Sequence, residues 1–530
     1  MKHTSFIKAG AVGAVLALSA AGLAACSTGD NNADGGNSGN GGNGKSTTIT
    51  MLVLGDKPTN GRLEAMLGQL NEKLSAEVGA TLDLYYVEWA DWQTQYNVKL
   101  LANDGSVDLI TTATDWLFAW ENAEKGAFLE LSPEMLQENA PKTWAQVDKD
   151  GDWDVTKLND TIYFIPEDNY TQYTNHGFFY RGDWAAEAGF ADGEITTFED
   201  FTTYFQWVKD NKPEAYPWDV AGANFAAIDG YIAGHTDLQT ISQVTAGNYF
   251  PFQTSEADQC TITSYLYEGD DLLGAANLAK EWNDLGVWRE DAINYDGDTR
   301  EELYAGLSGT DQHHTQTFIG QIVYNMETKQ PGSDPKMFHW GQENGNFFKD
   351  IKTHGAMAVS AASKNPELAL QVYDILRNDE EAYRLLNFGI EGTDYIITDD
   401  GKLGYPDGYD PSTDSLGSNF WAGRMDEFEL DKTTDAPDKW DIYAELDAVA
   451  KDYPYETLIV DKNSIDSTLA AVSGVLAQYL PQLQYGKVDD PAATIEKMRS
   501  ELKAAGFEDA QASLQANLDE WAESTGFSCN

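Results

Sequence analysis

Three short motifs carry acidic residues that suit recognition of a polyhydroxylated ligand. They are Gly55-Asp56, Glu88-Trp89 and Asp115-Trp116, and each follows a short apolar segment. A carboxylate accepts hydrogen bonds from adjacent hydroxyl groups, while an indole covers the C–H face of a sugar ring. The chemistry that these residue types indicate is therefore carbohydrate binding. For any single tryptophan, packing in a hydrophobic core is the alternative.

The segments before these motifs predict a sheet that holds them at one edge. Residues 48–54, 81–87 and 107–112 are short, apolar and rich in β-branched residues, which predicts strands. Between them, 62–78 repeats leucine and methionine at helical spacing, and 92–101 predicts a second helix. This β-α-β-α-β order predicts a parallel, doubly wound sheet, in which ligands bind beyond the carboxyl ends of the strands.

The first 26 residues are typical of a secretory leader. Lys2 and Lys8 precede an apolar run over 9–25 that ends at Cys26. The run is short for a membrane-spanning helix, and no basic cluster follows it. Leu23-Ala24-Ala25-Cys26 resembles the lipobox of bacterial lipoproteins, which implies cleavage before Cys26 and lipidation of its thiol; an ordinary secretory signal is the alternative. Residues 27–47 are rich in Gly, Asn and Ser, which predicts a flexible tether.

Composition limits the classes of function. About 500 residues remain after the leader, which is enough for two lobes. The formal net charge is −53, and it becomes about −55 when Lys2 and Lys8 leave with a leader that has no acids. Such a surface repels nucleic acid and disfavours anionic sugars, so we expect a neutral or cationic ligand.

Two cysteines remain besides Cys26. Cys260 and Cys529 are able to form a disulfide outside the cell and to attach the last residues to the body of the protein. Spacing alone leaves their pairing open.

The sequence resembles the family 1 extracellular solute-binding proteins of ABC sugar importers, and among them the long lipoproteins that bind oligosaccharides. The resemblance runs through most of the mature chain. It departs at Thr112-Ala113-Thr114-Asp115-Trp116, where the family has Ser-Ser-Trp or Thr-Ser-Trp, so its ligand contacts cannot be copied position by position. The motifs that carry the resemblance are KGAFLEL at 125–131, TIYFIPEDNY at 161–170, GFFYRGDW at 177–184, TFEDF at 197–201, HGAMAVS at 354–360, NPELAL at 365–370 and GIEGTDY at 389–395.

This resemblance implies a two-lobed α/β fold of the periplasmic-binding-protein type, class II, with a hinge between the lobes. The first lobe is expected from 48–165 and about 351–392, and the second from 166–350 and about 393–530. Hinge residues are expected near Ile165 and Gly392. The last three helices, near 466–480, 491–505 and 509–523, resemble the family's C-terminal extension.

A ligand between two such lobes would meet residues from several segments. The candidate ligand-binding residues are Asp56, Trp89, Asp115 and Trp116 at the strand ends, Asp168, Asn169 and Tyr170 at the first crossover, and Trp218, Tyr249, Trp288, His313 and Trp421 in expected loops. For each residue of the last group, core or ordinary surface placement is the alternative.

The sequence predicts a lipid-anchored receptor at the outer face of the bacterial cell membrane. It would be a monomer that captures a neutral oligosaccharide for an ABC permease, without enzymatic activity, cofactor or metal. A glycoside hydrolase needs two carboxylates around one glycosidic bond, and 87 acids offer too many candidates to test this alternative. A carbohydrate-binding surface protein outside transport is the other alternative. The acids at 148–152, and the run of Asn294, Asp296 and Asp298, match a calcium loop poorly, so solvated turns are preferred.

Overall fold

A computed structural model describes residues 46–168, 176–222, 227–410, 413–460, 462 and 465–529. The leader, Cys26 and nearly all of the expected tether lie outside these residues, as do Asn169 and Tyr170. In the part of the chain that is described, no helix is both long enough and apolar enough to cross a bilayer.

The three strands expected at the start of the chain are present and parallel, and they belong to a five-stranded mixed sheet. Its order is β2-β1-β3-β13-β6, and β1 runs parallel to both β2 and β3. β13 is antiparallel to β3 and to β6, so a strand from late in the chain separates two early ones. The strands are β1 (Thr47–Leu54), β2 (Ala80–Val87), β3 (Leu109–Thr112), β6 (Phe164–Pro166) and β13 (Ala356–Val359).

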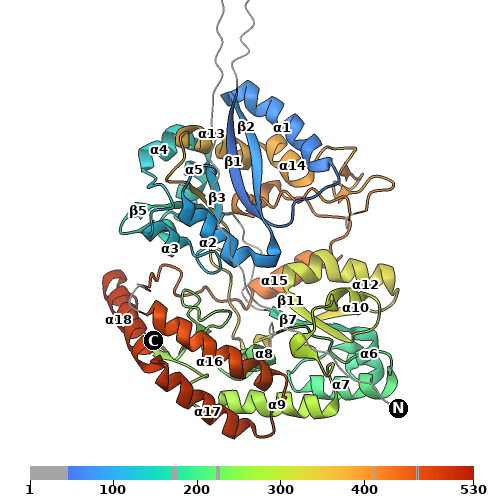
Figure 1. The fold of residues 1–530 in the computed structure, drawn as a ribbon. Helices are drawn as coiled ribbons and strands as arrows, with labels where there is room; N and C mark the ends of the chain where they lie inside the picture. Colours follow the sequence, from blue (N-terminus) through green and yellow to red (C-terminus); the bar gives the residue numbers. More distant parts are fainter. Residues whose placement is uncertain are drawn as a thin grey trace, which may run out of the picture. The chain divides into compact units, whose positions relative to one another are not determined.

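Both faces of this sheet are covered by helices, which explains why its strands are apolar almost throughout. Ile49, Met51 and Val53 of β1 pack with α1, α13 and α14 on one face. Leu52 and Leu54 point to the opposite face and pack with α2. Figure 1 shows α1, α13 and α14 beside β1 and β2. The helices are α1 (Arg62–Val78), α2 (Trp92–Ala102), α3 (Ala119–Glu124), α4 (Pro133–Asn139), α5 (Pro141–Asp150), α13 (Pro366–Asn378) and α14 (Glu380–Phe388).

A second, three-stranded sheet supports a core dominated by aromatic side chains. Its order is β11-β7-β12, with both neighbours antiparallel to β7. Phe178, Phe201, Trp218 and Trp282 form the centre of this core. The other face of β7 packs with α10, α12 and α15. The elements of this region are β7 (His176–Arg181), β11 (Thr310–His314), β12 (Pro335–His339), α6 (Gly182–Ala188), α7 (Asp200–Asn211), α10 (Thr299–Tyr304), α12 (Val323–Lys329) and α15 (Lys439–Asp447).

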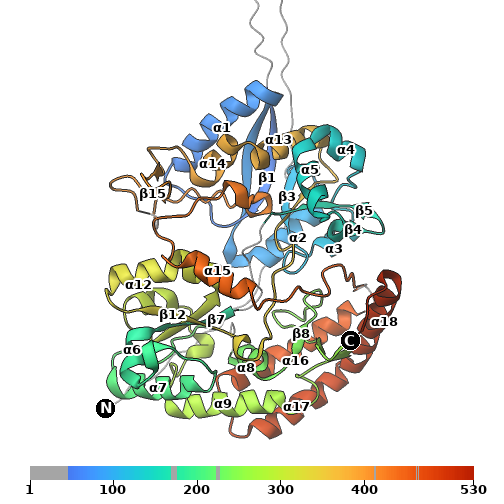
Figure 2. The same ribbon diagram turned by 180° about the vertical axis from the view of Figure 1, so that it is seen from behind.

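The C-terminal helices share a core with a segment from the middle of the chain. α17 packs on α9, as both views show (Figures 1 and 2), and α18 packs on β10. A disulfide joins Cys260 of β10 to Cys529, with their Cα atoms 5.4 Å apart, and this resolves the pairing that the sequence left open. The elements are α8 (Ala227–His235), β8 (Leu238–Thr240), β9 (Gln253–Ser255), β10 (Asp258–Thr263), α9 (Asp271–Leu285), α16 (Asp466–Gln484), α17 (Pro491–Ala504) and α18 (Phe507–Thr525).

One expected boundary needs correction. Residues after 392 were expected in the second lobe, but Leu416, Phe420 and Ala422 belong to the core of the first sheet. The chain leaves this core near Met425, whose backbone pairs with Asp168. The glycine turn near 392 resembles a hinge in sequence, but apolar residues further along the chain hold the segment against the first sheet.

Candidate functional site

The predicted acid and tryptophan motifs come to one edge of the first sheet. β1, β2 and β3 are parallel, so the motifs that follow them lie at the same end. The backbone N–H of Trp89 donates a hydrogen bond to Asp56 Oδ1 at 3.2 Å, which links the first two motifs directly.

Three tryptophans meet at this edge. The indole of Trp89 stacks on Trp421, with ring centroids 5.8 Å apart and planes 25° apart. Trp116 completes the group at 6.4 Å from Trp89 and 6.5 Å from Trp421. Trp89 and Trp421 remain 41% and 39% exposed, so ring surface is available to a ligand. We call Trp89, Trp116 and Trp421 the tryptophan cluster.

A hydrogen bond from the side chain of Asn419 to the backbone of β1 positions the segment that carries Trp421. Asn419 donates a side-chain hydrogen bond to the carbonyl oxygen of Leu54 at 2.7 Å. Gly55, the next residue, has φ 137°, and a Cβ at this position would lie 2.0 Å from Asn419 Nδ2. Glycine is therefore required here both by its backbone conformation and by the approach of the segment that carries Trp421.

Asp115 belongs to a charged group beside Trp116. His354 Nδ1 lies 2.7 Å from Asp115 Oδ2 and 3.4 Å from Asp350 Oδ2. Burial of His354 disfavours its charged form, but Asp350 and Asp115 outweigh this effect and raise the pKa of His354 well above its usual value. The indole N–H of Trp116 donates to the carbonyl oxygen of His354 at 2.9 Å, so this group also orients the ring.

Two crossing segments lie next to this group. Glu167 N–H donates to the carbonyl oxygen of Gly355 at 2.8 Å, and Asp168 N–H donates to that of Arg424 at 3.0 Å. Burial raises the pKa of Glu167 to about 8. Asp168, predicted as a ligand-binding residue, thus lies where the chain passes between the two sheets.

The remaining predicted residues do not join the tryptophan cluster. Trp218 and Trp288 are 1% and 4% exposed in the aromatic core, so other rings cover the faces that were expected to stack on a ligand. Tyr249 packs against the core that α16, α17 and α18 share with the middle of the chain. His313 lies on β11 and stacks on His176, with centroids 5.3 Å apart.

Sequence reasoning missed Trp92, Asp350, His354 and Asn419. Trp92 packs edge-on against Trp116, with centroids 5.4 Å apart. The spacing of Asp350 and His354 just before β13 could have indicated their position, because an antiparallel strand begins at the edge where its neighbour ends. The sequence contains no comparable signal for Asn419.

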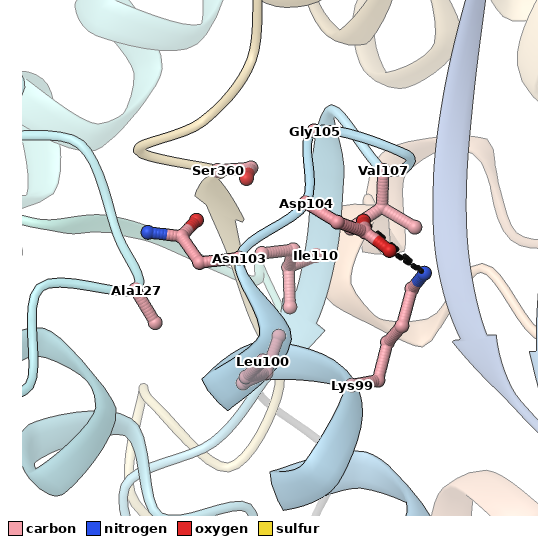
Figure 3. A pocket seen from close by; sticks show the side chains of 9 residues that line it. All are labelled: Lys99, Leu100, Asn103, Asp104, Gly105, Val107, Ile110, Ala127 and Ser360. Carbon is pink, nitrogen blue, oxygen red and sulfur yellow. Dashed lines mark hydrogen bonds and ion pairs between the residues drawn. The ribbon is translucent and has the colours of Figure 1, made fainter.

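The small pocket in Figure 3 is a different feature. It has a volume of about 10 Å³ and lies near the start of β3, whereas Asp115 and Trp116 follow its end. Such a volume holds about one water molecule. The pocket is therefore too small for a sugar. None of the predicted site residues lines it. Its lining residues are Lys99, Leu100, Asn103, Asp104, Gly105, Val107, Ile110, Ala127 and Ser360.

Comparison with known families identifies the class of protein. Residues 63–383, more than half of the chain, match the family described as bacterial extracellular solute-binding protein. The chain belongs to this family. Residues 454–523 match a domain of unknown function (DUF3502), which covers most of the C-terminal helices.

Relatives cover nearly the whole length of the chain. A carbohydrate ABC transporter substrate-binding protein of Streptococcus pneumoniae is 24% identical over 485 residues, which are 89% of this chain and 90% of that protein. The crystal structure of the N-glycan transport solute binding protein NgtS from S. pneumoniae has a TM-score of 0.73 at 19% identity, covering 90% of this chain and 99% of that one. An HMO-binding solute-binding protein from Bifidobacterium longum infantis has a TM-score of 0.64 at 16% identity, with 90% and 99% covered. These likenesses confirm the expected fold.

Proposed function

We propose that this protein captures a neutral oligosaccharide and delivers it to the permease of an ABC transporter. The observation that carries the proposal is the tryptophan cluster at the strand ends, with Asp56 and Asp115 directly beside it. Stacking rings cover sugar faces, and carboxylates orient hydroxyl groups. The cluster favours an oligosaccharide over a monosaccharide as the ligand, because each of several rings can stack on one sugar unit.

The relatives support the same conclusion. One is described as a carbohydrate ABC transporter substrate-binding protein, and two related structures are described as binding N-glycans or HMO. NgtS structures include complexes with Man1GlcNAc and Man5GlcNAc. The relatives are substrate-binding proteins rather than enzymes, which supports a receptor without catalysis.

The preference for neutral ligands rests on charge. The formal net charge of the chain is −53, and the acids next to the cluster include Asp56 and Asp115. An anionic sugar would have to overcome this field.

A ligand screen tests the proposal. The mature protein is melted with neutral N-glycan fragments, milk oligosaccharides and fructans, and separately with uronate oligosaccharides. A ligand at a hundredfold its Kd stabilises the folded state by about 2.7 kcal/mol. A rise in Tm with neutral oligosaccharides is expected. A rise with uronate oligosaccharides alone contradicts the neutral-ligand proposal.

Two further measurements separate the receptor from its alternatives. Chromatography of the incubated ligand detects turnover, and steady product release would identify a glycoside hydrolase. Small-angle scattering with and without ligand measures compaction and mass. A receptor that closes around its ligand becomes more compact as a monomer, whereas an open binding platform keeps its dimensions.

We also propose that Cys26 carries the lipid that holds the protein at the outer face of the cell membrane. Cys26→Ser should release the protein into the medium and abolish its labelling by a palmitate analogue. Retention of the label on the Ser variant contradicts this assignment. Ala25→Ser, which keeps the thiol, is the control.

A further inference from the structure

Three metal-ligating side chains converge beside Trp116. One ligand atom each from Asp115, Asp350 and His354 lies within 4.8 Å of the other two. Asp115 comes from the turn after β3, whereas Asp350 and His354 come from the segment before β13. The group therefore depends on the fold and not on a local sequence turn.

One buried carboxylate oxygen at this group lacks a hydrogen-bond partner among the described residues. Oδ1 of Asp115 is inaccessible to solvent and has no partner among the described residues. Glu167 is 6% exposed. Its carboxyl group faces Gly355, next to His354, since a Cβ on Gly355 would lie 2.9 Å from Glu167 Oε1 and 3.0 Å from Oε2. Leaving an oxygen such as Asp115 Oδ1 unsatisfied is costly, and a bound cation would satisfy it.

The local charges also favour a cation. Asp115 and Asp350 flank one imidazole, which can balance at most one of the two carboxylates. The neighbouring guanidinium of Arg424 is already bound to Asp426, with 2.5 Å between Nε and Oδ1.

We propose that Asp115, Asp350 and His354 bind a divalent cation of the first transition series. One nitrogen and two carboxylate oxygens suit Zn²⁺ or Mn²⁺ better than Ca²⁺ or Mg²⁺, which prefer oxygen alone. Zn–N and Zn–O bonds of about 2.1 Å place tetrahedral donors about 3.4 Å apart, and His354 Nδ1 and Asp350 Oδ2 are already 3.4 Å apart. The Asp115–His354 contact of 2.7 Å must widen by less than 1 Å.

Cation binding has a defined proton balance. The proton between Nδ1 of His354 and Asp115 leaves to solvent, and the freed Nδ1 lone pair binds the ion. Glu167 places a third carboxyl group next to those of Asp115 and Asp350. The ion would join the turn that carries Trp116 to the segment that leads into β13.

Calorimetric titration of the EDTA-treated, mature protein with Zn²⁺ at neutral pH tests this site. We expect one Zn²⁺ per chain, and affinity at least tenfold lower in Asp350→Asn and in His354→Gln. His235→Gln is the matched control, because His235 also pairs with an acid, Glu199, but lies at the surface on α8. Its Zn²⁺ affinity should equal that of the unmodified protein.

Two outcomes overturn the proposal. One is that neither Zn²⁺ nor Mn²⁺ binds stoichiometrically, which includes the case in which Ca²⁺ is the only ion that binds. The other is binding that Asp350→Asn leaves unchanged. Far-UV circular dichroism checks the fold of each variant, and the isosteric Asp350→Asn decides the test if His354→Gln does not fold. Sugar binding is not part of the readout, so the result is independent of the proposed transport function.

Discussion

Trp421 stacks on Trp89 with ring centroids 5.8 Å apart. Trp89 follows β2, whereas Trp421 belongs to a much later segment that packs in the core of the first sheet. This contact exists because the segment 416–422 returns to the first sheet after the chain has built the second one. The tryptophan cluster is thus assembled from two segments that lie far apart in the sequence.

Removing a ring from the cluster should weaken ligand binding. Trp89→Ala and Trp421→Ala each remove a stacking surface, and each should raise the Kd for a neutral oligosaccharide about tenfold, which is about 1.4 kcal/mol. Titration calorimetry measures the change. Trp440→Ala is the control, because Trp440 is 54% exposed on α15 and belongs to no part of the cluster. Equal affinity in all three variants contradicts a role of the cluster in binding.

Gly55→Ala should disturb the cluster through Asn419. The added methyl group would lie 2.0 Å from Asn419 Nδ2, so the segment that carries Trp421 must move. We expect lower thermal stability and weaker oligosaccharide binding. Gly126→Ala separates the two causes, because Gly126 also has a positive φ, 73°, but nothing lies within 4 Å of its added Cβ. That variant should lose about 1 kcal/mol of stability from backbone strain and keep its ligand affinity.

Stability should fall in acid because of three neighbouring histidines. Burial lowers the pKa of His176 to about 4, of His313 to about 2 and of His314 to about 3, with their mutual repulsion and nearby charges adding to the effect. The unfolded chain takes up these protons near pH 6.5 while the folded state resists them. Their contribution is therefore complete above about pH 6.5 and is lost progressively toward pH 4.

Urea unfolding between pH 7 and pH 4.5 measures this loss. His314→Asn should flatten the dependence of the free energy of unfolding on pH, because it removes one of the groups that resist protonation in the folded state. An equal slope in the His314 variant contradicts the assignment to these histidines.

The disulfide should stabilise the C-terminal region. Cys260 and Cys529 are 269 positions apart, so the bridge restricts a long loop of the unfolded chain. Cys260→Ser with Cys529→Ser should lower the free energy of unfolding by about 2–5 kcal/mol. Chemical denaturation compares this double variant with the parent, and reduction of the parent should reproduce the loss. A parent that reduction does not destabilise contradicts this expectation.

The strand ends of the first sheet could be predicted because their signals are local. The apolar runs predict β1, β2 and β3, and their parallel order places Asp56, Trp89 and Asp115 at one edge. Trp218 and Trp288 were candidates from expected loops, and they lie in the aromatic core, which was the alternative. A tryptophan in a core and one in a binding site look alike in sequence. Their surroundings come from α7, α9 and β7, which pack around them only in the folded protein.

The contact between Trp89 and Trp421 has a different origin. Trp421 was a candidate residue, but its place depends on Leu416 and Phe420 inserting into a distant core. The resemblance to the family placed that segment in the second lobe. Tertiary packing, rather than local pattern, decides its position.

The place of β13 in the first sheet constrains how the chain folds. β13 ends at Val359 and lies between β3 and β6. The five-stranded sheet is therefore incomplete until the chain up to residue 359 is present. Contacts between such distant segments form slowly, because the intervening loop must first be brought together. Until β13 arrives, the edge of β3 that it covers in the folded protein remains without its native partner.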